Sequence, residues 1–402
     1  MKSFDTTFLS RPGRWALLLL VAVASLLTGC CKNDEPEPVP VDRTVLIYML
    51  SDNSLGYYGY DTQNIKEILQ VAQAGELNGG NLIIYRDGGD TNPQLIQIKR
   101  NASGQAQKVI VREYPNRNSA TGEVLSAIVD ETVKLFPASE YGLILWSHST
   151  GWVPGNSSLA LSRKRWTGPL TRSFGQDGSN YMELDELARA LPDHRFRFIL
   201  TDACFMGSVE CAYQLRNKTD YYIGSAAEVM GTGMPYTLTI PLLFDYRLDL
   251  SSVCHAIYTY YNGLSGAYRT ATTSLIDCSK LEVLADATRT IFAAHSEEAA
   301  PDLTQVQHFD RQRPYICFDL RDYLSQIATA DEISLLDQAL AATVIYQAAT
   351  PSILGTVPVN THCGLSSYAL GSGDSTLDSY YTTLDWYQQV YPISNQEINK
   401  NH

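Results

Sequence analysis

Two reactive side chains follow apolar runs of the sequence, at the points where those runs end. His148 comes two residues after the segment 142–146 (GLILW), and Cys204 comes four residues after the segment 196–200 (FRFIL). An imidazole and a thiol are the groups that nucleophilic cysteine catalysis needs. If the two segments are neighbouring strands of a parallel sheet, their carboxyl ends share the edge where ligands of α/β sheets bind. The sequence therefore predicts that His148 and Cys204 meet as a dyad.

The residues around Cys204 favour a reactive thiol. A helical pattern runs from Phe205 to Leu215, so the positive end of that helix should lower the pKa of the thiol. Each residue also has a structural alternative. Cys204 and His148 could be core residues, and Asp202 could be the N-cap of the helix. Three other cysteines are expected to be buried and inert, because Cys211 lies in the middle of the expected helix and Cys278 and Cys317 lie in apolar patterns.

Strand and helix patterns alternate along the first 250 residues, which predicts an α/β fold with a mostly parallel sheet and helices on both faces. The expected strands are 44–50, 81–85, 108–114, 142–146, 196–200 and 221–224, and the expected helices are 61–74, 121–136, 183–191 and 205–215. After residue 250 the pattern loosens. Strands are expected at 272–276, 315–320 and 364–370, and helices at 280–295, 320–327 and 333–348. These form either a second subdomain or an extension of the first sheet.

Composition narrows the classes of function. The 402 residues are 45% hydrophobic and 18% charged, which permits a large core. The net charge of −13 argues against nucleic acid as a partner. The sequence has no zinc-binding spacing, no serine-hydrolase elbow and no phosphate-binding loop, so no metal or cofactor is expected. The acidic balance would permit calcium, but no loop has the calcium-binding spacing.

The first 29 residues have the pattern of an export signal. A basic start precedes the apolar stretch 15–27, and the sequence Leu-Thr-Gly then leads directly to Cys30. This junction resembles a bacterial lipobox, in which the cysteine is lipidated and becomes the mature N-terminus. The alternative is an ordinary secretory peptide with a chance cysteine. A lipid on Cys30 would hold the protein at a membrane without a spanning helix.

The segment 31–42 is rich in proline and acidic residues, which is typical of a solvated tether. Acidic residues near a lipid anchor resemble the surface-export signals of some Gram-negative lipoproteins. We therefore expect a protein anchored in the bacterial cell envelope, at the outer membrane, facing either the periplasm or the outside.

Four blocks, in order, resemble the clostripain family of cysteine peptidases, a branch of the caspase-like and gingipain-like superfamily. They are TVLIYMLSDNSL (44–55), LILWSHSTGW (143–152), LTDACFMGSVECAYQL (200–215) and GSAAEVMGTGMPY (224–236), with a softer match at CGLSSYAL (363–370). The resemblance covers about 43–390. It implies a caspase-like three-layer α/β/α sandwich with a C-terminal α+β extension. The expected divisions are a signal peptide 1–29, a tether 30–42, a catalytic core 43–250 and a C-terminal part 251–395.

The resemblance assigns roles to particular residues. Cys204 is the nucleophile, His148 is the base, and the backbone N–H groups of Cys204 and Ser149 bind the oxyanion. Asp202 is the wall of a pocket for Arg or Lys before the cut bond. Two residues of the site depart from the usual pattern of the family. Ser149 stands where the family usually has glycine, and the pocket loop has Thr232 where an acid is common, with Glu228 as its nearest acid.

A basic cluster lies between the two catalytic blocks, at Arg163, Lys164 and Arg165. Relatives are commonly activated by cutting themselves in this connection, although most short basic runs are simply solvated. The resulting hypothesis is a lipid-anchored cysteine endopeptidase that cuts extracellular or host proteins after Arg or Lys. The alternative is an inactive, lipid-anchored binding protein on the same fold, which the changes at Ser149 and Thr232 would explain.

Overall fold

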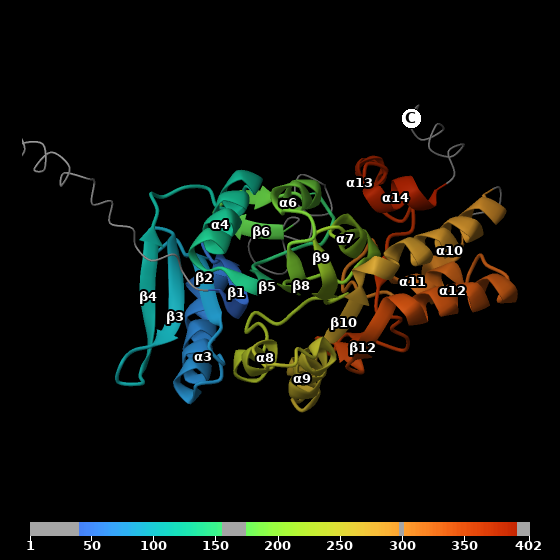
Figure 1. Ribbon diagram of the computed structural model, residues 1–402. Helices are drawn as coiled ribbons and strands as arrows, with labels where there is room; N and C mark the ends of the chain where they lie inside the picture. The colour runs from blue at the N-terminus through green and yellow to red at the C-terminus, as the bar shows by residue number, and fades with distance from the viewer. Residues whose placement is uncertain (1–39, 155–173, 297–300, 392–402) are drawn as a thin grey trace, which may run out of the picture. The chain divides into compact units, whose positions relative to one another are not determined.

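The computed structural model describes residues 40–154, 174–296 and 301–391. The main element of the fold is one sheet of nine strands. The strand order is β12-β10-β9-β8-β5-β1-β2-β3-β4 (Figure 1). The bounds are β1 Val41–Leu50, β2 Asn81–Asp87, β3 Gln94–Arg100, β4 Ala106–Glu113, β5 Ala138–Trp146, β8 Phe196–Asp202, β9 Thr219–Gly224, β10 Thr272–Asp277 and β12 Val344–Ala349. The five central strands, from β2 to β9, are parallel, and the outer ones pair antiparallel.

The central strands are buried on both faces, because their side chains alternate between two apolar cores. In β1, Leu46 and Tyr48 belong to one core, whereas Val45 and Ile47 belong to the other. Helices cover both faces (Figure 1). The first core includes α4 Gly122–Leu135, α6 Leu184–Ala190, α7 Val209–Gln214, α10 Leu281–Ala294, α11 Leu320–Leu324, α12 Ala330–Thr343, α13 Ser375–Tyr381 and α14 Asp385–Val390. The second includes α3 Tyr60–Ala74, α8 Tyr236–Leu243 and α9 Leu250–Asn262. The predicted three-layer α/β/α sandwich is confirmed.

Helix α4 illustrates how local sequence forms these layers. The Thr121 side chain accepts a hydrogen bond from the backbone of Val124, so it caps the first turn. Leu125, Ile128 and Val129 are buried at helical spacing, so a single face of the helix packs on the sheet.

Two strands after residue 250, β10 and β12, extend the first sheet, and the shorter strands of this part form two separate two-stranded sheets. β10 pairs antiparallel with β9, and β12 pairs with β10. The predicted helix 333–348 is wrong at its end, because α12 stops at Thr343 and Val344 begins β12. The β-branched residues Val344 and Ile345 favour that strand. The sequence prediction also missed β3, α8 and α9. Shorter strands complete the fold: β6 Phe174–Asp177, β7 Asn180–Met182, β11 Phe318–Asp319, β13 Ser352–Ile353, β14 Val357–Pro358 and β15 Ser366–Ser367.

Candidate active site

The register of two neighbouring strands brings His148 and Cys204 to the same edge of the sheet. β5 and β8 are parallel, and Trp146 is paired with Asp202 at their carboxyl ends. His148 and Cys204 therefore each follow a paired residue by two positions. The predicted gap of four residues before Cys204 is wrong, because β8 continues to Asp202. The prediction that the two strands are neighbours is confirmed.

Both side chains line one cavity of about 290 Å³. Its walls come from segments that follow the carboxyl ends of four adjacent parallel strands, β1, β5, β8 and β9, and from two residues of the C-terminal part. The lining includes Leu55, Ser149, Phe205, Val229, Arg311 and Leu354. A cavity at this edge is where an α/β sheet of this type binds its ligand.

The backbone around Cys204 differs from the helical start that the sequence predicted. α7 begins only at Val209, where the Ser208 hydroxyl caps it by accepting from the backbone N–H of Cys211. Phe205 has a φ of 58°, in the left-handed region, so the chain turns sharply just after the nucleophile candidate. The N–H of Phe205 donates to the carbonyl of Ala227 at 3.0 Å. This turn projects Cys204 from the sheet edge before the helix begins.

The thiol of Cys204 is protonated in this conformation. The backbone N–H of Val229 donates to Sγ at 3.3 Å. Loss of hydration raises the pKa of the thiol to about 12, and the nearby carboxylate of Glu228 adds to the rise. The predicted lowering of this pKa by a helix is wrong for this state, since the helix amino terminus lies several residues further along the chain.

His148 is neutral and bonds to a residue that the sequence analysis missed. Its Nε2 lies 2.8 Å from the hydroxyl of Ser54, and burial lowers the pKa of the imidazole to about 4. Ser54 begins α2, Ser54–Tyr57. Asn53 caps this turn and donates from its amide to the carbonyl of Leu50 at the end of β1. The feature of the sequence that could have pointed to Ser54 was its position just after the first strand.

The loop after His148 is packed tightly against the loop after Cys204. Gly151 has a φ of 70°, and a Cβ added there would lie 2.5 Å from the carbonyl oxygen of Phe205. The Ser149 hydroxyl accepts from the N–H of Gly151 at 2.9 Å, so this side chain is engaged within its own loop. A serine in place of the usual glycine is therefore accommodated beside the cavity.

Asp202 is buried and has one unsatisfied oxygen. Its Oδ2 accepts from the N–H of Met234 and from the hydroxyl of Tyr236, both at 3.0 Å. Its Oδ1 has no hydrogen-bond partner. Burial raises the pKa of this carboxyl to about 6. The alternative role of Asp202 as a helix N-cap is wrong, because Ser208 caps α7.

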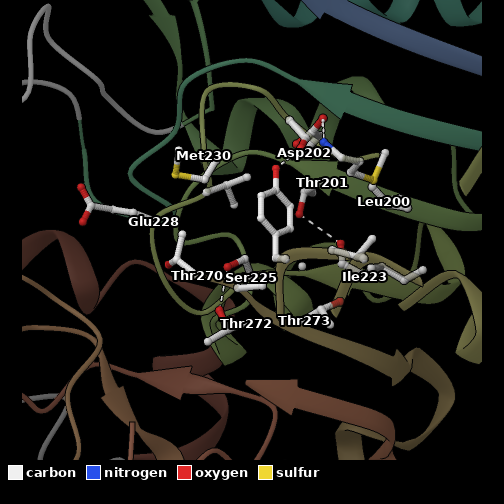
Figure 2. Close-up of a pocket in the computed structure, with 17 residues that line it drawn as sticks. Leu200, Thr201, Asp202, Ile223, Ser225, Glu228, Met230, Thr270, Thr272 and Thr273 are labelled. Atoms are coloured by element: carbon white, nitrogen blue, oxygen red, sulfur yellow. Dashed lines mark hydrogen bonds between the residues drawn. The ribbon is translucent and has the colours of Figure 1, made fainter. Parts of the chain in front are cut away.

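A second, smaller cavity of about 30 Å³ adjoins the first and shares Asp202, Glu228, Val229, Met230 and Gly233 with it. Figure 2 shows the lining of this smaller cavity. This volume holds about one or two waters, so a Lys or Arg side chain can enter only if the lining moves. Gly233 has a φ of 70°, and a Cβ there would lie 2.6 Å from Oδ2 of Asp202. Thr232 lines neither of these two cavities, and its hydroxyl lies 3.2 Å from that of Tyr261.

Glu228 is at the wall of both cavities, but its carboxylate is already paired. It accepts from both Nε and Nη2 of Arg311, with Nη2 at 2.8 Å from Oε1. Figure 2 shows the Glu228 side chain directed away from Asp202. Sequence reasoning missed Arg311, which lies 83 residues from Glu228 and in none of the four blocks.

The remaining sequence predictions fall outside the residues that the structure describes. These are the lipidation site Cys30 and the basic cluster Arg163, Lys164 and Arg165. Among residues 40–154, 174–296 and 301–391, no group of three or more His, Cys, Asp or Glu side chains has a metal-binding arrangement. Over the same residues, no helix has both the length and the apolar character to cross a membrane.

Comparison with known proteins identifies the family of this chain. The sequence pattern of the clostripain family matches residues 47–394. Among curated proteins, none matches at a significant level. Of solved structures, an inactive zymogen C11 protease from Parabacteroides distasonis is 35% identical, with a TM-score of 0.77 over 88% of this chain and 99% of that one.

Two further structures, both of a secreted C11 cysteine protease from Bacteroides thetaiotaomicron, are similar. One is 27% identical with a TM-score of 0.76, and covers 88% of this chain and 100% of its own. The other, in complex with an irreversible peptide inhibitor, is 29% identical with a TM-score of 0.74 over 87% and 98% of the two chains. Family pattern and fold agree with the sheet-edge cysteine and histidine: the chain belongs to the clostripain family and is a cysteine peptidase.

Proposed function

We propose that this peptidase uses Cys204 and His148 as its catalytic dyad and cuts after Arg or Lys, with Asp202 reading the basic side chain. The observation that carries the proposal is the register of β5 and β8, which brings both reactive groups and Asp202 to one cavity. The unsatisfied Oδ1 of Asp202 supports the specificity, because a buried carboxylate oxygen gains most from a cationic partner.

The reaction follows from these groups. The Cys204 thiol gives its proton to His148, and the thiolate attacks the carbonyl carbon of the peptide. Backbone N–H groups of Cys204 and Ser149 hold the negative oxygen of the tetrahedral intermediate. His148 returns the proton to the leaving amine, which leaves an acyl-enzyme, and water then releases the acid. In the resting state Sγ bonds to Val229, so substrate binding must turn it toward His148.

We also propose that the protein is held in the cell envelope by a lipid on Cys30 and cuts itself near 163–165. The junction before Cys30 supports the lipid, the description of a similar structure as secreted supports export, and the basic cluster at 163–165 supports the self-cut. A palmitate analogue fed to cells should label the chain, and the label should be lost in Cys30→Ser.

A peptide library tests the proposed specificity. The purified full-length chain is incubated with peptides that vary at each position around the cut, and the new termini are read by mass spectrometry. Cuts after Arg or Lys, together with a self-cut at 163–165, support the proposal. Cuts after other residues would remove Asp202 as the selector, and absence of any cut, with or without calcium and reductant, would favour the inactive binding protein.

Removing the hydroxyl of Ser54 should slow catalysis without weakening substrate binding. Because Ser54 contacts Nε2, it leaves Nδ1 as the nitrogen that exchanges protons with the thiol and the leaving amine. We expect Ser54→Ala to lower kcat about tenfold with KM unchanged, and to shift the acid limb of the pH profile. Ser54→Thr, which keeps the hydroxyl, should retain most of the activity. An unchanged kcat and pH profile in Ser54→Ala would contradict this role.

The preference for basic substrates should weaken in acid. Asp202 has a pKa of about 6, so it is ionised above that pH and neutral below it. A cationic side chain binds the ionised form, so the preference is present at pH 7.5 and lost as the pH falls through 6. At pH 5, we expect the ratio of kcat/KM for an arginine peptide over its citrulline isostere to be about tenfold lower. A ratio independent of pH would contradict the role of Asp202.

A further inference from the structure

The cavity that holds Cys204 has two acidic residues on its wall, and only one of them, Asp202, keeps a carboxylate oxygen without a hydrogen-bond partner. Glu228 is paired through both of its oxygens with the guanidinium of Arg311, and both side chains are partly buried. Asp202, in contrast, keeps an unpaired oxygen. The guanidinium of Arg311 thus occupies the carboxylate of Glu228. A basic side chain of a substrate would otherwise be able to bind there.

A braced loop holds Arg311 in this position. The backbone N–H of Phe309 donates to the carbonyl of Cys317 at 2.8 Å, which closes the loop. Inside it, the buried carboxylate of Asp310 accepts from the N–H groups of Ile316 and Cys317. Hydrogen bonds on both sides of Arg311 limit the positions that its side chain can reach. The ion pair with Glu228 therefore belongs to a fixed part of the C-terminal region.

The partner Glu228 lies in a segment that contacts the nucleophile directly. The carbonyl of Ala227 accepts from the N–H of Phe205, and the N–H of Val229 donates to Sγ of Cys204. Glu228 lies between these two contacts, so its backbone position is set by the catalytic loop. Its carboxylate can turn toward a substrate in the cavity only through side-chain torsions, which the two bonds to Arg311 restrain.

We propose that Arg311 is a specificity-determining residue: it withholds Glu228 from basic substrates, so that Asp202 alone reads a cationic side chain. The inference rests on the proposed catalytic site and deepens it. With Arg311 in place, the Glu228–Arg311 pair is neutral toward the substrate. Without Arg311, Glu228 would add a second negative charge to a partly buried cavity and strengthen selection for Arg and Lys.

The test compares kcat/KM for an arginine peptide with kcat/KM for its citrulline isostere, in the full-length chain. The ratio cancels any change in the reactivity of the thiol, since both substrates meet the same nucleophile. We expect Arg311→Gln to raise this ratio about tenfold. The double variant Glu228→Gln/Arg311→Gln, which carries neither charge, should return the ratio to that of the wild type.

A matched control is available in the same region. Arg321 pairs with Asp337 at 2.9 Å, outside the residues that line the catalytic cavity. Arg321→Gln breaks an ion pair of the same chemistry and should leave the ratio unchanged. If Arg311→Gln does not fold, as judged by thermal unfolding, the double variant still tests the proposal, because it removes both charges of the pair and a lowered ratio in it would overturn the proposal.

Each outcome bears on the proposal. A raised ratio in Arg311→Gln that is abolished in the double variant supports it. An unchanged or lowered ratio in Arg311→Gln overturns it, because the freed Glu228 would then add nothing to the selection of Arg. A lowered ratio in the double variant also overturns it, because Glu228 would then already read the substrate in the wild type. If the wild type cuts after neutral residues, the proposed Arg/Lys specificity fails, yet new cutting after Arg in Arg311→Gln would still support the role of Arg311.

Discussion

Replacing Cys204 by alanine is expected to abolish peptide cleavage. The thiol lines the cavity two residues beyond the carboxyl end of β8, just as His148 lies two residues beyond the end of β5. Without sulfur no acyl-enzyme can form, so we expect kcat/KM to fall at least about 10⁴-fold. The fold should survive, since Sγ makes only weak hydrogen bonds to the backbone of Val229. Activity is measured with the best peptide of the library, and folding by thermal unfolding.

Two controls separate a nucleophile from a core cysteine. Cys254, fully buried in α9, is a cysteine that the mechanism does not use, so Cys254→Ala should keep its activity. A thiol-reactive peptide probe should label the wild type at Cys204, as shown by mass spectrometry, and should fail to label His148→Ala at a comparable rate. Retained cleavage in Cys204→Ala would refute the dyad, and equal labelling of His148→Ala would remove His148 from it.

Replacing Asp202 by asparagine should have the second largest effect, and only on basic substrates. The asparagine carbonyl can take over the two hydrogen bonds from Met234 and Tyr236, so the loop keeps its anchor. The amide then places N–H groups where the unpaired Oδ1 was, and these repel a cation. We expect kcat/KM for the arginine peptide to fall about 100-fold, because one partner of a buried ion pair is lost. The citrulline peptide should be cut as by the wild type.

An exposed aspartate supplies the control for net charge. Asp220 lies in β9 and pairs with Arg197 away from the cavity, so Asp220→Asn changes the charge by the same amount without touching the site. Its selectivity should equal that of the wild type. Equal losses for the arginine and citrulline peptides in Asp202→Asn would show a structural role for Asp202 rather than a selective one.

The described conformation is a resting state by its chemistry. The thiol bonds to Val229 and the imidazole to Ser54, so each group of the dyad is held by another partner. Burial disfavours the charged form of both, which raises the pKa of Cys204 and lowers that of His148. A substrate that fills the cavity and supplies a cation to Asp202 would change this balance. The Cys204→Ala prediction therefore tests the nucleophile in this substrate-bound state, and the Asp202→Asn prediction tests the carboxylate that binds the substrate's cation.

Much of this architecture follows from local sequence. The segments 45–50 and 142–146 are continuously apolar, and 196–200 is apolar except for Arg197, as is typical of strands buried on both faces. Their order along the chain, with His148 after one and Cys204 after another, was enough to predict a shared edge. The spacing of apolar residues in 121–136 likewise predicted α4 closely. These features depend on neighbours in sequence, so a single sequence carries them.

Only the tertiary structure decided which distant groups meet. Ser54 and His148 are 94 residues apart, and Glu228 and Arg311 are 83 apart, so no local periodicity relates them. Their contacts depend on strand order and register, which are set by how the whole sheet packs. The sharp turn at Phe205 likewise displaced the helix that the pattern of 205–215 favoured. The sequence determined the reactive residues and the sheet edge they share, and tertiary packing determined their partners, because those contacts join segments that the chain brings together only when folded.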